Sequence, residues 1–256
     1  MKEILKVQNL NKTFTSTQKG MFGAKTVKHA VDDLSFSAYE GEIFGLLGPN
    51  GAGKTTTMRM LATLIKPDSG DALIDGASIV NDPEIVRSKI GFLTSELKLD
   101  DFFTPNYLFD FFARLYQMDE TAIRSRKEHL FKKFGITEFA DVKVANLSQG
   151  MRQKTSLVIS IVNDPKFIIF DEPTNGLDVL TARTVTDFLK ELKAEGKSII
   201  VSTHIFSLIE KTCDRVGIII DGKMIRCDSL KDLTAQKDLE TVFFEIYDNY
   251  EKDENE

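Results

Sequence analysis

The sequence is poor in cysteine and has no long apolar run. Its 256 residues include two cysteines, Cys213 and Cys227, which excludes a disulfide-rich secreted scaffold, and no CxxC pair indicates structural zinc. No uninterrupted apolar run approaches the roughly 20 residues that a membrane helix needs. The first ten residues carry charges within their apolar stretch, unlike a secretory signal. We therefore expect a reduced, cytoplasmic protein, in which any membrane role requires a partner chain.

An excess of positive charge is also missing. The chain has 33 Lys and Arg residues against 39 Asp and Glu residues, a formal net charge of -6. This balance argues against a dedicated nucleic-acid binder, so we expect no nucleic acid among its partners. Apolar residues make up 42% of the chain and charged residues 28%, which is enough apolar material to bury a core.

Three short apolar runs, 43–47, 167–170 and 198–201, are typical of strands buried on both faces of a parallel sheet. A helical stripe that ends before Gly196 separates the last two runs. This alternation predicts an α/β fold with a parallel sheet. Segments 3–14 and 33–39 are predicted to form an N-terminal antiparallel β subdomain, and Asp221 with Gly222 indicates a hairpin.

The remaining segments are predicted less sharply. Segment 96–162 shows helical patterns without a clear strand, so we expect a helical subdomain inserted in one domain spanning 1–235. Within it, 102–118 is apolar on more than one face, which fits either a deep core or a docking surface. Segment 15–30 is basic and without acidic residues; it is interpreted as a solvated hairpin loop or as a basic flap near a phosphate ligand or a membrane partner. Residues 236–256 form a C-terminal extension, and its acidic tail is expected to fray.

A phosphate-binding loop follows the first buried strand. The sequence GPNGAGKT at 48–55 matches G-x-x-x-x-G-K-[ST] and precedes an amphipathic helix. Glycines let several backbone N–H groups point at one anion, and the helix N-terminus adds positive potential. The candidate nucleotide-binding residues are Gly48, Pro49, Asn50, Gly51, Ala52, Gly53, Lys54, Thr55 and Thr56. Lys54 is expected on the β- and γ-phosphates, and the Thr55 hydroxyl on Mg²⁺.

Two adjacent acids end the second buried strand. A carboxylate at Asp171 can support Mg²⁺, and one at Glu172 can polarise an attacking water. The alternative is a pair of ordinary solvated turn residues. The N-K-x-D motif with which GTPases read guanine is not apparent, since Asn11 and Lys12 continue into Thr13 and Phe14.

A second helix start carries an unusual charge pattern. Ser148 is a good N-cap, yet Arg152 and Lys154 follow in the first turn, where the helix dipole disfavours cations. That arrangement costs stability unless an anion lies nearby. This helix start could therefore face the nucleotide of another copy of the chain.

Together these motifs resemble the nucleotide-binding domain of an ABC ATPase, over about residues 4–235. GPNGAGKTT at 48–56 resembles Walker A, LSQGM at 147–151 the LSGGQ signature, FIIFDEPTNGLD at 167–178 Walker B with the D-loop, and Ser202-Thr203-His204 the switch histidine. The resemblance implies a P-loop NTPase (RecA-like) core. It also implies ATP and Mg²⁺ as ligands.

The resemblance assigns a role to each motif residue. Phe14 would stack on adenine, although it could be a strand core residue. Asp171 would support Mg²⁺, Glu172 would be the general base, and His204, otherwise a structural histidine, would bind the γ-phosphate. Asp178 would be the D-loop residue, the N-cap of the following helix, or both. Ser148 and Gly150, with Gln149 between them, would contact the ATP of the opposite subunit.

Two positions depart from the family pattern. Ser95 stands where the Q-loop glutamine is expected, and its side chain is too short to reach Mg²⁺ as glutamine does. The link between the nucleotide and the helical subdomain would then run through water or Glu96. Gln149 replaces the first signature glycine, so its side chain must point away from the nucleotide.

The resemblance implies an ATP-hydrolysing subunit that dimerises around two ATP molecules, as a homodimer, and drives a separate transmembrane permease from the cytoplasmic face of the membrane. The motif wording is similar to that of sodium-efflux and drug-resistance exporters, which suggests sodium ion or a drug as cargo. Two alternatives stay open: a soluble ABC ATPase that acts on a non-membrane partner, and a nucleotide sensor with little hydrolysis.

Overall fold

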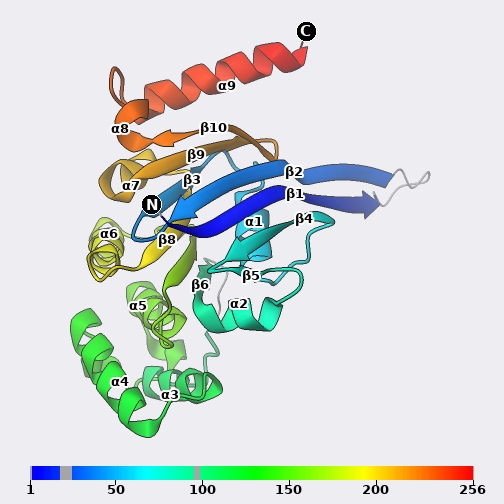
Figure 1. Cartoon of the computed structure of the whole chain (residues 1–256). Helices are drawn as coiled ribbons and strands as arrows, with labels where there is room; N and C mark the ends of the chain where they lie inside the picture. Colours follow the sequence, from blue (N-terminus) through cyan, green and yellow to red (C-terminus); the bar gives the residue numbers. More distant parts are fainter. Residues whose placement is uncertain (1, 18–24, 95–98, 256) are drawn as a thin grey trace.

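The computed structural model describes residues 2–17, 25–94 and 99–255 (Figure 1). In Figure 1 the helical segment α3–α5 lies at one end, two sheets form the middle, and the C-terminal helix α9 lies at the opposite end. None of the helices in these described ranges is long and apolar enough to cross a membrane.

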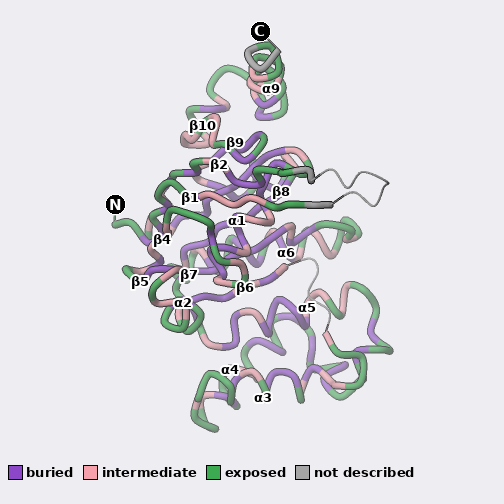
Figure 2. Tube along the Cα trace, turned by 90° about the vertical axis from the view of Figure 1, so that its right-hand side faces the viewer, coloured by how far each residue is buried: buried purple, intermediate pink, exposed green. Residues whose placement is uncertain are grey.

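The central sheet, over the described residues, has six strands in the order β10-β9-β3-β8-β7-β6, and every neighbouring pair except β10 and β9 is parallel. The strands are β3 (Ile43–Leu47), β6 (Ile90–Thr94), β7 (Phe167–Asp171), β8 (Ser198–Thr203), β9 (Arg215–Ile220) and β10 (Lys223–Ser229). The three predicted apolar runs are β3, β8 and β7, and each is buried along its whole length (Figure 2). The predicted α/β fold with a parallel P-loop core is confirmed.

Both faces of this sheet are covered because alternate residues of each strand enter different cores. Ile168 and Phe170 of β7 belong to a cluster with the helical segment and the C-terminal helices. Phe167 and Ile169 belong to a second cluster with the N-terminal strands and the first helices. The covering helices are α1 (Lys54–Leu61), α2 (Pro83–Lys89), α6 (Val179–Ala194) and α7 (Phe206–Thr212).

An antiparallel sheet forms the N-terminal part, as predicted, with the order β2-β1-β4-β5 among the described strands. Its members are β1 (Glu3–Thr17), β2 (Lys25–Tyr39), β4 (Ser69–Ile74) and β5 (Ala77–Ser78). The expectation of a loop over 15–30 is wrong for both flanks, because Thr15 pairs with Val27 and Phe14 with Lys28. β-Branched residues on both sides favour this extension of the hairpin.

The helical segment lies between β6 and β7 in the chain. It consists of α3 (Pro105–Leu115), α4 (Glu120–Phe134), two 3₁₀ turns (Thr137–Phe139 and Val144–Asn146) and α5 (Gln149–Ser160). The Thr104 hydroxyl caps α3 by accepting from the Tyr107 N–H, and α4 ends at Gly135, whose φ is 63°.

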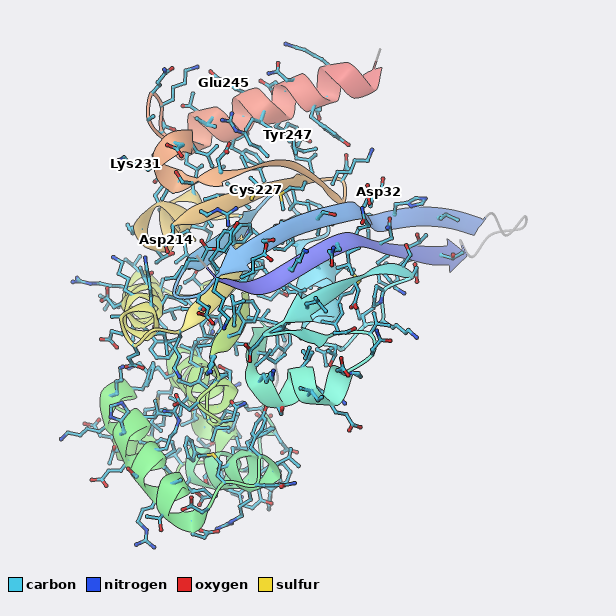
Figure 3. All side chains as sticks on the ribbon, viewed as in Figure 1. Asp32, Asp214, Cys227, Lys231, Glu245 and Tyr247 are labelled. Atoms are coloured by element: carbon cyan, nitrogen blue, oxygen red, sulfur yellow. The ribbon has the colours of Figure 1, made fainter. Side chains whose placement is uncertain are left out.

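The C-terminal extension is ordered rather than frayed. After α8 (Leu230–Leu233), α9 (Leu239–Asn255) continues through the acidic tail. Leu239 and Phe243 are buried, and the Phe243 ring lies 5.3 Å from the Phe206 ring of α7. Tyr247, seen on α9 in Figure 3, extends this contact by stacking on Phe243 at 6.1 Å. The acidic pattern concealed an apolar stripe that holds the helix on the domain.

Replacing Phe243 with alanine should destabilise the domain by about 3 kcal/mol, because a 6% exposed aromatic ring is removed from a packed cluster. Thermal unfolding followed by circular dichroism measures the loss. Phe244→Ala is the matched control, since that neighbouring ring is 50% exposed and should cost under about 1 kcal/mol. Equal midpoints for the two variants would show that α9 is not packed as described.

Candidate functional site

The phosphate-binding loop joins β3 to α1 at the carboxyl edge of the central sheet. Two of its glycines are required by close contacts: a Cβ at Gly48 would lie 2.2 Å from the Ile219 carbonyl oxygen, and one at Gly53 would lie 2.1 Å from that of Ala30. Gly53 also has a φ of 100° and caps α1 from the left-handed region. The loop is thus locked between β9, β2 and the start of the helix.

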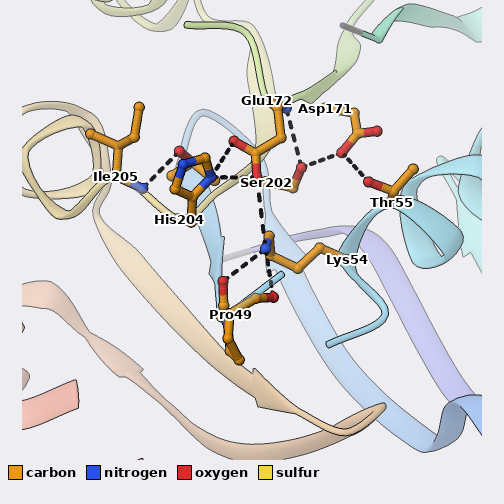
Figure 4. A network of polar contacts seen from close by, with 10 residues as sticks. Pro49, Lys54, Thr55, Asp171, Glu172, Ser202, His204 and Ile205 are labelled. Carbon is orange, nitrogen blue, oxygen red and sulfur yellow. Dashed lines mark hydrogen bonds and ion pairs between the residues drawn. The ribbon is translucent and has the colours of Figure 1, made fainter. Parts of the chain in front are cut away.

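Lys54 is the first residue of α1, and its side chain is only 5% exposed. Its ammonium donates hydrogen bonds to the carbonyl oxygens of Gly48, at 2.7 Å, and Pro49, at 3.1 Å, and lies 3.7 Å from a Glu172 carboxylate oxygen (Figure 4). Burial lowers the pKa of Lys54, and the neighbouring carboxylates oppose this shift. A buried cation of this kind has high affinity for a further anion.

Asp171 ends β7 and is 1% exposed. Its Oδ1 accepts hydrogen bonds from the hydroxyls of Thr55, at 3.2 Å, and Ser202. Burial raises the pKa of Asp171, and the two hydroxyls partly offset this effect. A hydroxyl and a carboxylate in contact suit Mg²⁺, which takes its other ligands from water and phosphate. No cluster of three or more acidic, His or Cys residues that could bind a metal by protein ligands alone occurs in the described ranges.

Glu172 and His204 face each other across the ends of β7 and β8. The His204 Nδ1 lies 3.1 Å from both Glu172 carboxylate oxygens (Figure 4). Glu172 has a φ of 52°, which is uncommon for a residue with a side chain, and its N–H donates to the Ser202 carbonyl oxygen at 3.0 Å. This backbone conformation turns the Glu172 side chain away from the strand and toward Lys54.

A cavity of about 480 Å³ opens above the loop. It gathers most of the predicted nucleotide residues, and Phe14, 43% exposed, forms part of its wall. The lining residues are Phe14, Lys28, Ala30, Asn50, Gly51, Gly53, Lys54, Thr55, Thr56, Glu172, Asn175 and His204. The sequence analysis did not predict three of these lining residues as nucleotide-binding: Lys28, Ala30 and Asn175. For Lys28, the only signal in the sequence was the basic composition of segment 15–30.

The signature residues do not line this cavity. They lie at the start of α5, where the Ser148 hydroxyl caps the helix by accepting from the Met151 N–H at 3.2 Å. The Gln149 side-chain amide donates to the Gly176 carbonyl oxygen at 2.9 Å, so it points toward its own chain. A Cβ at Gly150 would lie 3.0 Å from the Thr181 hydroxyl. Signature and P-loop are therefore separate surfaces of one chain.

The charge argument for this helix start needs correction at one residue. Arg152 donates hydrogen bonds to the carbonyl oxygens of Leu147, at 3.1 Å, and Ala145, at 3.3 Å. The guanidinium thus has partners in its own chain, and its position does not by itself require an external anion.

Two further predicted residues have different outcomes. Asp178 is the N-cap of α6: its Oδ1 accepts from the N–H groups of Leu180, at 2.9 Å, and Thr181, at 3.1 Å. The Thr181 hydroxyl also donates to its Oδ2 at 2.6 Å, and this bond, followed by those from the N–H groups, lowers the pKa of the Asp178 carboxyl. Ser95 and Glu96 lie outside the described residues.

A buried lysine in a glycine loop, a hydroxyl and carboxylate suited to Mg²⁺, and a second carboxylate at the strand edge define a P-loop nucleoside triphosphatase. The sequence profile of the family described as ABC transporter matches residues 31–175, more than half of the chain. The protein belongs to this family, as one of its ATP-binding subunits, and the recognition made from the motifs is confirmed.

Three known proteins place this chain within the family. It is 37% identical over 235 residues to the ABC transporter ATP-binding protein NatA of Bacillus subtilis, covering 90% of this chain and 96% of NatA. It is 37% identical over 222 residues to Nod factor export ATP-binding protein I of Ralstonia nicotianae, covering 87% and 66%. A dimeric post-hydrolysis structure of the cassette MJ0796 with ADP and Pi superposes with a TM-score of 0.76 at 27% identity, covering 88% and 98%.

Membership establishes the general activity. The chain is an ATP-binding ATPase domain, and domains of this family dimerise and work with membrane permease components. The predicted enzyme class is confirmed.

Lys54→Ala should weaken ATP binding by about tenfold or more, because it removes the buried charge at the base of the cavity. Equilibrium binding of ATP to the purified chain measures the change. Lys66→Ala removes an exposed lysine outside the cavity and should leave the affinity unaltered. Unchanged affinity in Lys54→Ala, with the fold intact by circular dichroism, would contradict the assignment of the cavity.

Proposed function

We propose that this chain is the ATP-hydrolysing subunit of a membrane exporter, acting as a homodimer on the cytoplasmic face through a separate permease. The observation that carries the proposal is the placement of Glu172 within reach of both Lys54 and His204, while the signature residues of the same chain face elsewhere. One chain then supplies the chemistry for one ATP and the closing surface for another.

Each residue of the cavity has a role in binding. Phe14 stacks on the adenine ring from the hairpin side, and the backbone N–H groups of loop 48–53 hold the phosphates. Lys54 neutralises the β- and γ-phosphates, and Thr56 contacts a further phosphate. Thr55 and Asp171 would hold Mg²⁺, which supplies charge neutralisation for phosphoryl transfer. Ser95 is a further candidate to contact this metal.

Hydrolysis uses the pair at the strand edge. Glu172 accepts a proton from the attacking water, and His204 contacts the γ-phosphate and keeps the carboxylate in line. The described geometry supports this division, because the His204 ring holds the Glu172 carboxylate at 3.1 Å beside the Lys54 ammonium. A base held by two cationic or polar partners loses little entropy on reaching its reactive position.

The second half of each site comes from the partner copy. Ser148 and Gly150 of the partner contact the γ-phosphate, with Gln149 turned back onto its own chain. Asp178 and the residues after it cross the seam. The apolar side chains of Val179 and Leu180 are 84% and 77% exposed, which supports the presence of a contact surface directly after the D-loop.

Glu172→Gln should preserve ATP binding and slow hydrolysis by about 100-fold or more, since the amide cannot accept the proton. ATP should then accumulate in a dimer that gel filtration resolves from the monomer. Glu84→Gln changes an exposed acid on α2 and serves as the control. Parental turnover by Glu172→Gln, measured as phosphate release, would remove Glu172 from its role.

A surface on α3 fits the permease. Phe103, Tyr107 and Phe111 form a ladder of stacked rings, with centroid distances of 4.4 Å and 6.3 Å, and Tyr107 and Phe111 are each 49% exposed. Tyr107 and Phe111 line a groove of about 380 Å³ together with Asp110, Arg114 and Leu115. The opposite face of α3 is buried through Leu108 and Phe109, so the helix is both core and candidate docking surface.

The resemblance implies that a cytoplasmic helix of the permease occupies this groove. The exporter direction is supported by the name of the relative from Ralstonia nicotianae, a Nod factor export protein. The cargo, sodium ion or a drug, is proposed from the resemblance of the motifs alone, since the permease chooses it.

Phe111→Arg should abolish co-purification with the proposed permease, because a cation replaces an apolar contact in the groove. ATP binding by the isolated subunit should not change. Leu64→Arg is the matched control, as Leu64 is a 60% exposed apolar residue outside the groove. Retained co-purification and cargo transport with Phe111→Arg would contradict the docking assignment.

A further inference from the structure

The wall of the nucleotide cavity that faces the phosphate-binding loop comes from the β1–β2 hairpin. Phe14 of β1 and Lys28 of β2 are directly paired in the antiparallel register. Directly paired residues point to the same face of a sheet, and both side chains line the cavity. The hairpin thus presents an aromatic ring and a cation side by side to the same ligand.

The Lys28 ammonium reaches the phosphate-binding loop itself. A Cβ built at Gly51 would lie 3.5 Å from the Lys28 Nζ, closer than any other atom outside the neighbouring residues. Gly51 is in the middle of the loop, between Asn50 and Ala52. The Lys28 ammonium therefore lies beside the turn of this loop, and Lys28 and Lys54 line the same cavity.

The charge of Lys28 is available to a ligand. Within residues 2–17, 25–94 and 99–255, no carboxylate lies within ion-pair distance of its ammonium. The one carboxylate that lines the cavity, Glu172, is held by Lys54 and His204. Lys12, by contrast, is paired with Asp68 and lies over the Phe14 ring at 5.7 Å.

We infer that Lys28 is a second phosphate-binding lysine, which holds the phosphate chain of ATP from the hairpin side. The inference rests on the proposed assignment of the cavity. Two ammonium groups, one on the hairpin and one at the start of α1, fix the position of a polyanion and neutralise its charge better than a loop of backbone N–H groups alone. Lys28 also ties the hairpin to the nucleotide, so that the ring of Phe14 is positioned by the same contact.

Two ligands distinguish phosphate binding by Lys28 from a purely structural role of this residue. Inorganic tripolyphosphate carries the phosphate chain without the base. If Lys28 contacts phosphate, Lys28→Met should weaken binding of both ATP and tripolyphosphate by a similar factor of about ten. If Lys28 instead only supports Phe14 or the hairpin, ATP binding should weaken and tripolyphosphate binding should not.

The experiment measures ATP affinity of the full chain by calorimetry and tripolyphosphate affinity by competition. Phe14→Ala is the opposite case and should weaken ATP but not tripolyphosphate. Lys28→Arg should retain most of both affinities, because it keeps the charge. Lys6→Met removes an exposed lysine of the same sheet that does not line the cavity, and it should change neither affinity.

The outcomes also distinguish this inference from the assignment of the cavity. Loss of both ligands in Lys54→Ala with no loss in Lys28→Met would overturn the role of Lys28 and leave the cavity in place. If Lys54→Ala also bound both ligands normally, the cavity assignment itself would fail. Thermal unfolding of each variant identifies any loss of affinity that comes from a damaged fold. If Lys28→Met is damaged in this way, the test rests on Lys28→Arg, which should retain most of both affinities.

Discussion

The other groups of the site are arranged around the buried ammonium group of Lys54. Lys54 is almost removed from water, and its charge is balanced by two loop carbonyls and the Glu172 carboxylate. Removing a charged group from water costs free energy unless neighbouring groups compensate its charge and accept its hydrogen bonds. The close contacts at Gly48 and Gly53 hold the loop against β9 and β2, and the positive φ of Glu172 accompanies the approach of its carboxylate to Lys54. In the proposed function, a phosphate chain takes over part of this balance at Lys54.

The parallel sheet explains why these groups meet. β3, β7 and β8 are neighbours that run in the same direction, so their carboxyl ends deliver Lys54, Asp171 and His204 to a single edge. The middle residues of these strands are apolar and buried, whereas polar side chains such as Asp171 and Ser202 are buried at the carboxyl ends of β7 and β8. Asp171 is the last residue of β7, His204 directly follows β8, and Lys54 follows β3 after the glycine loop, so the sheet holds the backbone of this edge while the side chains meet there.

The sequence was sufficient for the parts of the fold in which local pattern and chemistry agree. The glycine loop, the acids after β7 and the three buried strands are continuous in the chain, so spacing alone located them. The hairpin flanks around Thr15 and Val27 were missed because their alternation is weak and their pairing is with each other rather than with the core. β4 was not predicted because its partner β1 is distant in the sequence, and β5 was not predicted because it has only two residues. α9 was obscured by its acidic surface, and Lys28 could be placed beside Gly51 only in three dimensions.

Two side-chain amides connect the surfaces that one chain contributes to different ATP molecules. Gln149 bonds to Gly176 and Gln153 bonds to Pro173, so the start of α5 is fastened to the segment that follows Glu172. In the proposed dimer, these two hydrogen bonds make the start of α5 and the segment after Glu172 move together within each chain. A movement of the segment after Glu172, beside one nucleotide, is then transmitted to the start of α5, beside the other nucleotide. The proposed dimer therefore binds and releases its two ATP molecules together rather than independently.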